Sequence, residues 1–227
     1  MNRSQLNTIM EKWTYTPDIL GINNFFRAAV LVSLVFINNE YHFLFQKRAS
    51  NIRQGGEISF PGGKYEESDK DFEYTAIRET CEELGITQDK IIVLKELDTL
   101  VSPFESIIKS YLGVININSL DELNINKDEV EKVFLIPVDY ILNTQPKEFF
   151  VEMEINPHQV DENSNRITIF PAKKYNLPAK YHKKWKGTPR KIYLYEHSGE
   201  VVWGFTANIL KDTAEKIEKL LKEVADV

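Results

Sequence analysis

Runs of apolar and β-branched residues mark the first half of the chain as a set of strands separated by short polar turns. The longest such run lies in residues 27–37 and predicts a buried strand, and residues 41–46 predict a second one. Asn38 and Asn39 lie between them and favour a tight turn, so we expect a hairpin here. The same pattern predicts two further strands, at residues 91–100 and 111–117.

A helix is predicted from about residue 69 to residue 84, after a glycine-rich turn. Ser68 or Asp69 is expected to cap its start, and Asp71 completes a pattern similar to a capping box. Gly85 follows the last apolar residue, at the place where a left-handed C-terminal cap is expected. The predicted apolar stripe of this helix consists of Ile77, Cys81 and Leu84.

Helical spacing of apolar residues also occurs towards both ends of the chain. Residues 1–24 predict an extension whose short amphipathic helix packs onto the domain or onto a partner chain, such as the second copy of a homodimer. The apolar residues of that helix are Leu6, Ile9, Met10 and Trp13. The last helix is expected to pack one apolar face into the core, formed by Leu210, Ala214, Ile217, Leu221 and Val224.

Residues 145–200 have a less regular pattern and are interpreted as an elaboration of the domain. Strands are predicted at residues 149–155, 167–170 and 192–195, with a turn at residues 163–165. A lysine-rich loop is predicted at residues 173–191. One interpretation of this segment is a flap that faces the substrate.

Composition narrows the class of protein. A length of 227 residues with 42% hydrophobic content is enough for one sizeable core, so residues 25–227 are predicted to form a single domain. The formal net charge of -6 argues against a general nucleic-acid binder. The longest apolar run is interrupted by Ser33 and is too short to cross a membrane. The single cysteine excludes an intramolecular disulfide, and the start shows no signal segment, so we expect a cytoplasmic protein.

An acidic cluster on the predicted helix points to metal chemistry. Glu79, Glu82 and Glu83 are spaced so that their carboxylates share one helical face, with Arg78 beside Glu82. Such charges repel one another unless a hard cation such as Mg²⁺ or Mn²⁺ binds among them. The alternative is an ordinary solvated surface, since glutamate-rich helices are common.

Basic residues upstream of the helix suggest an anionic ligand. Lys47, Arg48, Arg53 and Lys64 would collect positive charge near the metal helix, which suits a ligand with several phosphates. The alternative is that Lys47 and Arg48 only end a strand on its solvent side.

The sequence of residues 78–86 resembles the second half of the Nudix box, and Gly63 corresponds to the glycine of that motif. This chain differs from the usual box in three ways. Asp69 stands in place of a glutamate, one extra residue precedes Arg78, and Thr80 stands where an aliphatic residue is commoner. The first two differences are typical of the branch that resembles coenzyme A pyrophosphatases.

Three other segments resemble that same branch. Residues 75–80 read Thr-Ala-Ile-Arg-Glu-Thr, and residues 203–210 resemble its Trp-Gly-Leu-Thr-Ala-Arg-Ile-Leu segment. Arg48 and Arg53 belong to an element similar to its Arg-Ser/Ala-x3-Arg pattern, which precedes the Phe-Pro-Gly-Gly of residues 60–63. The link between Arg53 and that turn is one residue shorter than the usual form.

The resemblance implies an α/β/α sandwich with a mixed sheet and a C-terminal helix. Within it, residues 132–138 resemble a strand of the family, and residues 139–142 are expected to begin a helix. It also implies that Gly63 lends a backbone carbonyl to the metal and that a further carboxylate comes from Glu129, with Glu105 as the other candidate. Within the cluster, Glu82 is the leading candidate for the general base, and Arg78 is interpreted as orienting the carboxylates.

The implied function is metal-dependent hydrolysis of a nucleoside-diphosphate-linked small molecule. Coenzyme A or an acyl derivative is the favoured substrate, and the products would be 3′,5′-ADP and 4′-phosphopantetheine. The alternatives within the family are ADP-ribose, dinucleoside polyphosphates and oxidised nucleotides. A module that senses a nucleotide without cleaving it remains a third alternative, against which the complete carboxylate set argues. An isomerase of isoprenoid diphosphates is disfavoured, because it would need a cysteine outside the helix and Cys81 is the only one.

Overall fold

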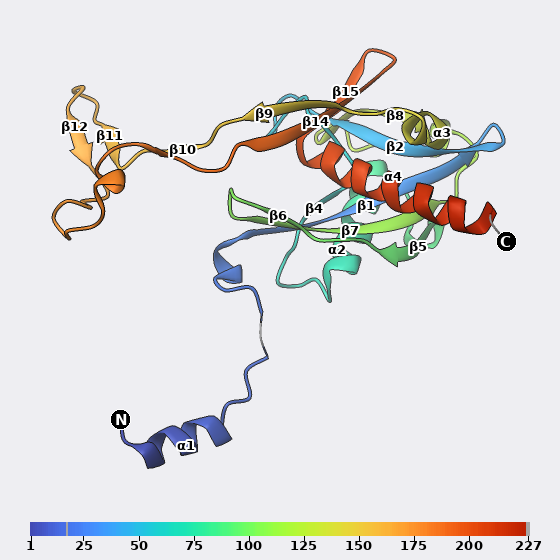
Figure 1. Ribbon diagram of the computed structural model, residues 1–227. Helices are drawn as coiled ribbons and strands as arrows, with labels where there is room; N and C mark the ends of the chain where they lie inside the picture. Colours follow the sequence, from blue (N-terminus) through green and yellow to red (C-terminus); the bar gives the residue numbers. More distant parts are fainter. Residues whose placement is uncertain (17, 226–227) are drawn as a thin grey trace.

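A mixed sheet forms the centre of the molecule in the computed structural model, which describes residues 1–16 and 18–225 (Figure 1). Its long central strand β1 (Phe26–Ile37) pairs antiparallel with β2 (Glu40–Arg48) and parallel with β7 (Ser106–Ile115). The other strands extend this core on both sides. They are β3 (Ile58–Ser59) and β8 (Val130–Pro137) beside β2, β4 (Gly62–Lys64) beside β1, and β5 (Ile91–Glu96) and β6 (Leu100–Ser102) beside β7.

Helices cover the two faces of this sheet, so the predicted α/β/α sandwich is confirmed (Figure 1). The α2 helix (Phe72–Leu84) packs Ala76 and Leu84 against Leu31 and Leu44 of the sheet. The opposite face carries α3 (Val138–Leu142) and the first part of α4 (Gly204–Ala225) over a second cluster. The largest fully buried residues of that cluster are Phe43, Phe45, Phe60, Ile136, Ile141 and Leu210.

Most strand predictions for the first half are confirmed, with two changes of boundary. Asn38 and Asn39 both adopt positive φ, at 55° and 63°, in the turn between β1 and β2. The predicted strand at residues 91–100 is broken after Glu96 into β5 and β6. The β7 strand begins five residues earlier than the predicted 111, because the polar residues at its start pair with β1 and β6.

The start of α2 differs from the prediction. Asp71, and neither Ser68 nor Asp69, caps the helix by accepting a hydrogen bond of 2.8 Å from the Tyr74 N–H. The predicted stripe is only partly right, because the buried residues include Ala76, Thr80 and Leu84 whereas Ile77 and Cys81 are half-buried.

Gly85 ends α2 in the left-handed conformation, at φ 64°, as predicted. A Cβ at this position would lie 1.9 Å from the carbonyl oxygen of Asn124. Glycine is therefore required here both by backbone conformation and by the close approach of another segment.

Residues 145–200 form a small sheet and a projecting arm. The strands β9 (Lys147–Val151) and β15 (Glu200–Trp203) flank β14 (Arg190–His197). Between β9 and β14, residues 152–189 extend away from the body of the molecule (Figure 1). This arm contains two short pairs: β10 (Glu154–Ile155) with β13 (Trp185–Lys186), and β11 (His158–Val160) with β12 (Arg166–Thr168).

The arm changes several predicted boundaries. The predicted strand at residues 149–155 is divided between β9 and β10, and β12 covers only part of the predicted 167–170. The lysine-rich loop is interrupted by β13 and by a short 3-10 helix. The turn at residues 163–165 is confirmed, with Ser164 at φ 64° and Asp161 accepting two backbone hydrogen bonds. The four 3-10 turns of the described residues are Ile22–Asn24, Gln88–Lys90, Leu120–Glu122 and Ala179–His182.

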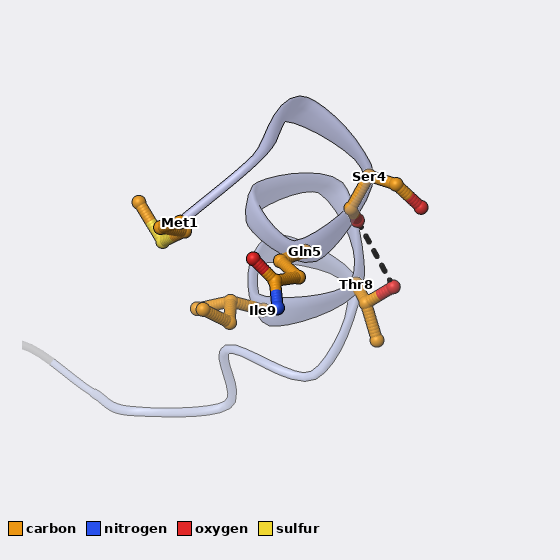
Figure 2. Close-up of a pocket in the computed structure, with 5 residues that line it drawn as sticks. All are labelled: Met1, Ser4, Gln5, Thr8 and Ile9. Carbon is orange, nitrogen blue, oxygen red and sulfur yellow. Dashed lines mark hydrogen bonds between the residues drawn. The ribbon is translucent and has the colours of Figure 1, made fainter.

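The two terminal helices are less covered than predicted. All residues of α1 (Arg3–Glu11) are exposed and the helix lies apart from the body, so its packing onto the domain is not observed (Figure 1). A surface hollow beside this helix is formed by its own side chains (Figure 2). In α4, Leu210 and Ala214 are buried as predicted, but Leu221 and Val224 are exposed because the helix runs beyond the sheet. No helix among the described residues is both long and apolar enough to span a membrane.

Candidate active site

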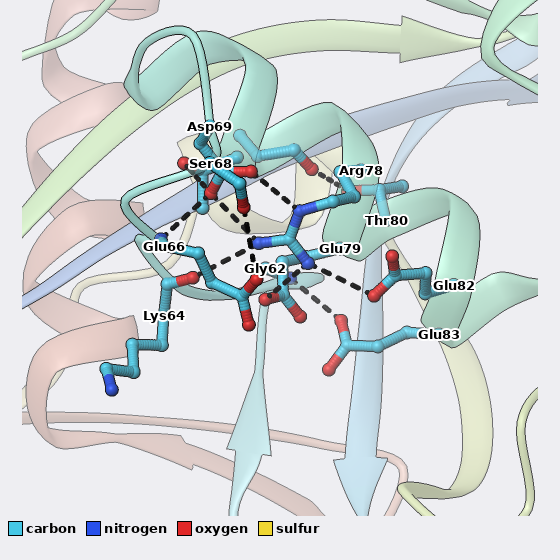
Figure 3. A network of polar contacts seen from close by, with 12 residues as sticks. Gly62, Lys64, Glu66, Ser68, Asp69, Arg78, Glu79, Thr80, Glu82 and Glu83 are labelled. Carbon is cyan, nitrogen blue, oxygen red and sulfur yellow. Dashed lines mark hydrogen bonds and ion pairs between the residues drawn. The ribbon is translucent and has the colours of Figure 1, made fainter.

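An ion pair between Asp69 and Arg78 organises the site (Figure 3). Arg78 donates from Nε to one carboxylate oxygen at 2.9 Å and from Nη2 to the other at 3.0 Å. Asp69 also accepts hydrogen bonds from the Thr75 hydroxyl and from the Glu66 N–H. The Arg78 guanidinium lowers the pKa of the nearly inaccessible Asp69 carboxyl to about 2.

Arg78 also holds two carboxylates of its own helix. Its Nη1 atom lies 3.0 Å from Glu79 and 3.1 Å from Glu82, so the role predicted for Arg78, orienting these side chains, agrees with this geometry (Figure 3). Its Nη2 atom donates to the Lys64 carbonyl oxygen at 3.2 Å, which ties α2 to the end of β4.

Glu83 is buried against the glycine-rich turn. The Gly62 N–H donates a hydrogen bond of 2.8 Å to one Glu83 oxygen, and Arg48 Nη1 lies 3.9 Å from the other. Burial raises the pKa of Glu83 to about 8.

Gly63 allows the turn to approach α2 closely. A Cβ at this position would lie 2.4 Å from the Glu79 carboxylate. The prediction that Gly63 contributes to the site is therefore consistent with its position, although its role as a carbonyl ligand stays a prediction.

The chemistry of the donor set fits a hard divalent cation. Glu79 is largely buried, and burial raises its pKa, which the nearby Glu82 and Glu129 carboxylates raise further against the opposing effect of Arg78. Buried carboxylates with few positive charges nearby favour a hard cation, which prefers oxygen ligands. Among the described residues, no three acidic, histidine or cysteine side chains are already arranged around one point that would hold an ion. Binding therefore requires the carboxylates now held by Arg78 to turn towards the cation.

The two candidates for an additional carboxylate differ in position. Glu129 is exposed, yet its carboxylate lies close enough to raise the pKa of Glu79. Its carbonyl oxygen accepts a hydrogen bond from the Ala49 N–H, so the backbone before β8 is tied to the end of β2. Glu105 lies in the turn between β6 and β7, where its carbonyl oxygen accepts from the Phe26 N–H. The structure favours Glu129 on this basis.

The four basic residues are not equally close to the carboxylates. Arg48 approaches Glu83, and its Nε atom donates to the Arg53 carbonyl oxygen at 3.4 Å. The Arg53 guanidinium stacks on the Phe26 ring at 5.5 Å. Lys47 is paired with Glu131 at 2.7 Å, and the Lys64 side chain extends away from the carboxylates (Figure 3). Arg48 is therefore the basic residue that the fold places at the site most directly.

Two residues of this site were missed from the sequence alone. The sequence did not show that Asp69 binds Arg78. The one indication was that Asp69 replaces the usual glutamate of the box, with one extra residue before Arg78. Gln46 lies fully buried on β2 and lowers the pKa of Glu83 through its amide. A polar amide directly after the apolar run Phe43-Leu44-Phe45 was the signal for it.

Burial raises the pKa of the Cys81 thiol, which disfavours a nucleophilic role.

Known proteins with similar sequences include coenzyme A diphosphatases. The mitochondrial coenzyme A diphosphatase NUDT8 of Homo sapiens is 35% identical over 120 residues, covering 52% of this chain and 51% of that protein. The peroxisomal coenzyme A diphosphatase NUDT7 of Mus musculus is 33% identical, covering 52% and 50%. This chain thus spans about half the length of these curated relatives. The predicted resemblance to the coenzyme A pyrophosphatase branch is confirmed at this level of sequence similarity.

Other similarities extend over more of the chain but are weaker. An uncharacterized Nudix hydrolase, NudL of Photorhabdus laumondii, is 25% identical over 203 residues, covering 89% of this chain and 90% of that protein. The NUDIX domain of Shewanella oneidensis NrtR, solved with ADP ribose, aligns with a TM-score of 0.43 at 18% identity, covering 64% of this chain and 89% of that chain. A TM-score of this size is too low to support a conclusion.

The match to a protein family covers the sheet and the site together. Residues 27–172, well over half of the chain, match the family described as NUDIX domain. This segment runs from β1 to β12 and includes Asp69, Arg78 and the three glutamates of α2. The chain therefore belongs to the Nudix family, as the motif around Arg78 predicts.

Proposed function

We propose that this protein hydrolyses the pyrophosphate linkage of a nucleoside-diphosphate-linked compound with the help of Mg²⁺ or Mn²⁺. The observation that carries the proposal is the pairing of Glu79 and Glu82 with Arg78, which is itself fixed by Asp69, and the buried Glu83 of the same helix, which accepts from the Gly62 N–H. Similarity to proteins named as coenzyme A diphosphatases favours coenzyme A or an acyl derivative as the substrate. The expected products are 3′,5′-ADP and 4′-phosphopantetheine.

The residues of the site have separate roles in this proposal. Glu79 and Glu83, with Gly63, would hold the cation, which when bound neutralises phosphate oxygens and lowers the pKa of water. Glu82 has the most exposed carboxylate of the three, at 55%, so it is the best placed to accept a proton from the attacking water. Arg78 keeps Glu82 oriented. Glu129 is the additional acidic side chain within electrostatic range.

The basic residues are assigned to the substrate. Arg48 and Arg53 face phosphate groups in this proposal, because Arg48 ends β2 next to Glu83 and donates to the carbonyl oxygen of Arg53 in the loop that follows. Lys47 and Lys64 would act at longer range, since Lys47 is already paired with Glu131. A local basic group of this kind is needed in a chain of net charge -6 that binds an anion.

A substrate panel tests the proposal. The protein is incubated with Mg²⁺ and, separately, coenzyme A, ADP-ribose, diadenosine polyphosphate or oxidised dGTP, and the products are identified by chromatography. We expect 3′,5′-ADP from coenzyme A. Cleavage of another member alone would overturn the substrate assignment, and binding without cleavage would identify a nucleotide sensor.

Glu82→Gln tests the base assignment within the same assay. We expect turnover to fall roughly 10²- to 10⁴-fold, the usual contribution of a positioned general base. Glu105→Gln is the matched control, because this glutamate is exposed and, among the described residues, its side chain forms no ion pair or hydrogen bond with Glu79, Glu82 or Glu83. Unchanged turnover in Glu82→Gln would exclude Glu82 as the base.

A further inference from the structure

Gln46 is a buried amide without hydrogen-bond partners. Its side chain on β2 is fully inaccessible, and neither its Nε2 nor its Oε1 atom makes a hydrogen bond with any residue that the structure describes. Buried side-chain amides are normally paired, because an unpaired one loses its hydration without replacement. An unpaired amide in the centre of a sheet therefore calls for an explanation.

The position of Gln46 within β2 directs its side chain to α2. Residues two apart in a strand share a face, and Leu44 on this face packs with Ala76 and Leu84 of α2. Arg48, two residues on, approaches Glu83. Gln46 thus lies on the α2 side of the sheet between an apolar contact and an ionic one.

Glu83 has spare capacity to accept a hydrogen bond from this amide. Its one close hydrogen bond comes from the Gly62 N–H, and the Arg48 guanidinium is 3.9 Å away. A carboxylate has about four acceptor positions on its two oxygens. The Gln46 amide is near enough to lower the pKa of Glu83 even though the two groups are not in hydrogen-bonding geometry.

We propose that Gln46 is a positioning residue for the cation site, whose amide donates to Glu83 and fixes the orientation in which Glu83 presents an oxygen to the cation. The inference rests on the proposed metal-dependent function. The unpaired amide lowers the free energy of unfolding of the metal-free protein. With a cation held by Glu83, the Gln46 amide would donate to the second acceptor positions of that carboxylate, so the amide would favour the cation-bound state.

A purely structural role for Gln46 makes a different prediction. Its cross-strand neighbour on β3 is Ser59, whose hydroxyl is also buried without a partner. If the two groups only fill space or pair with each other, then replacing Gln46 would change stability and leave cation affinity unchanged. Cation affinity without substrate is therefore the measurement that separates the two roles.

Gln46→Met tests the inference, because methionine keeps the unbranched shape and removes the amide. Binding of Mn²⁺ alone is measured by titration calorimetry, and unfolding of the metal-free protein by urea. We expect Mn²⁺ binding to weaken about 10-fold or more, the usual effect of losing a group that orients a ligand, with unchanged or increased metal-free stability. Gln46→Leu is the second variant if methionine packs poorly.

Ser110→Ala is the matched control. Ser110 is the other fully buried polar residue with an unpaired side chain, and it lies on β7 next to residues that pack towards α4. We expect it to leave Mn²⁺ affinity unchanged. In a Glu83→Gln background, Gln46→Met should cause no further loss, because the two residues act through one contact.

The outcomes separate this inference from the proposed function. If Gln46→Met and Gln46→Leu bind Mn²⁺ as tightly as the wild-type protein, then only the role proposed for Gln46 is overturned. If the wild-type protein binds Mn²⁺ but does not cleave coenzyme A, then the substrate assignment is overturned and the role of Gln46 is unaffected. A wild-type protein that binds no Mn²⁺ overturns both.

Discussion

At the scale of single residues, the site depends on Asp69, which lies outside α2 and holds Arg78 from the loop before it. The pair is bidentate, and the Asp69 side chain is only 1% exposed. Arg78 in turn orients Glu79 and Glu82. A group that never contacts the cation or the substrate thus determines where two of the carboxylates lie.

Asp69→Asn should therefore weaken both the fold and the site. Removing one partner of a nearly buried, doubly hydrogen-bonded ion pair is expected to cost roughly 2–4 kcal/mol of unfolding free energy. Urea unfolding measures the loss. Asp71→Asn is the control, because Asp71 caps α2 from an exposed position and asparagine caps equally well. Equal stability of both variants would contradict the role given to Asp69.

The same pair predicts the acid limit of stability. The pKa of Asp69 is lowered from 3.8 to about 2 by Arg78, so its contribution is complete above the unfolded value. The contribution is lost as pH falls through the folded value. We expect the wild-type protein to lose stability faster than Asp69→Asn between about pH 4 and pH 2.

At the scale of elements, two glycines affect α2 in different ways: Gly85 ends the helix, and Gly63 lets the turn approach Glu79 in its middle. Gly85→Ala should destabilise the protein by more than about 1 kcal/mol, because φ is 64° and the new Cβ would meet the Asn124 carbonyl oxygen. Gly63→Ala should instead displace the Glu79 carboxylate and reduce turnover more than stability. Urea unfolding and the coenzyme A assay measure the two effects. Gly187→Ala is the control, since nothing lies within 4 Å of its new Cβ.

The same elements show how far the sequence alone was informative. Periodicity located β1, β2 and α2, because their apolar residues are buried at strand or helix spacing, whereas β8 was expected from the family resemblance. The cap at Asp71 and the bond between Asp69 and Arg78 could not be predicted, because Ser68, Asp69 and Asp71 can all cap a helix and their order along the chain does not show which of them binds elsewhere. The split into β5 and β6 depends on pairing with β7, which lies later in the chain.

At the scale of the whole molecule, the sheet separates two tasks. The α2 face carries the carboxylates, and the α3 and α4 face carries the largest aromatic cluster. The arm of residues 152–189 belongs to neither face and extends away from the body (Figure 1). Its position indicates that the arm is not needed to complete the sheet.

Deleting the arm tests whether it is a substrate-facing flap. Val151 and Arg190 are direct partners in the β9–β14 ladder, so an Asn-Gly turn can replace residues 152–189 and close a regular hairpin. We expect the shortened protein to fold with similar stability and to keep its Mn²⁺ affinity, because the arm extends away from the body of the molecule that contains β2 and α2 (Figure 1). Turnover of coenzyme A should stay within about 3-fold, less than one kcal/mol in the barrier. A rise of KM above 10-fold with unchanged Mn²⁺ affinity would instead show that the arm closes over the substrate, whereas loss of folding would show that it supports the small sheet.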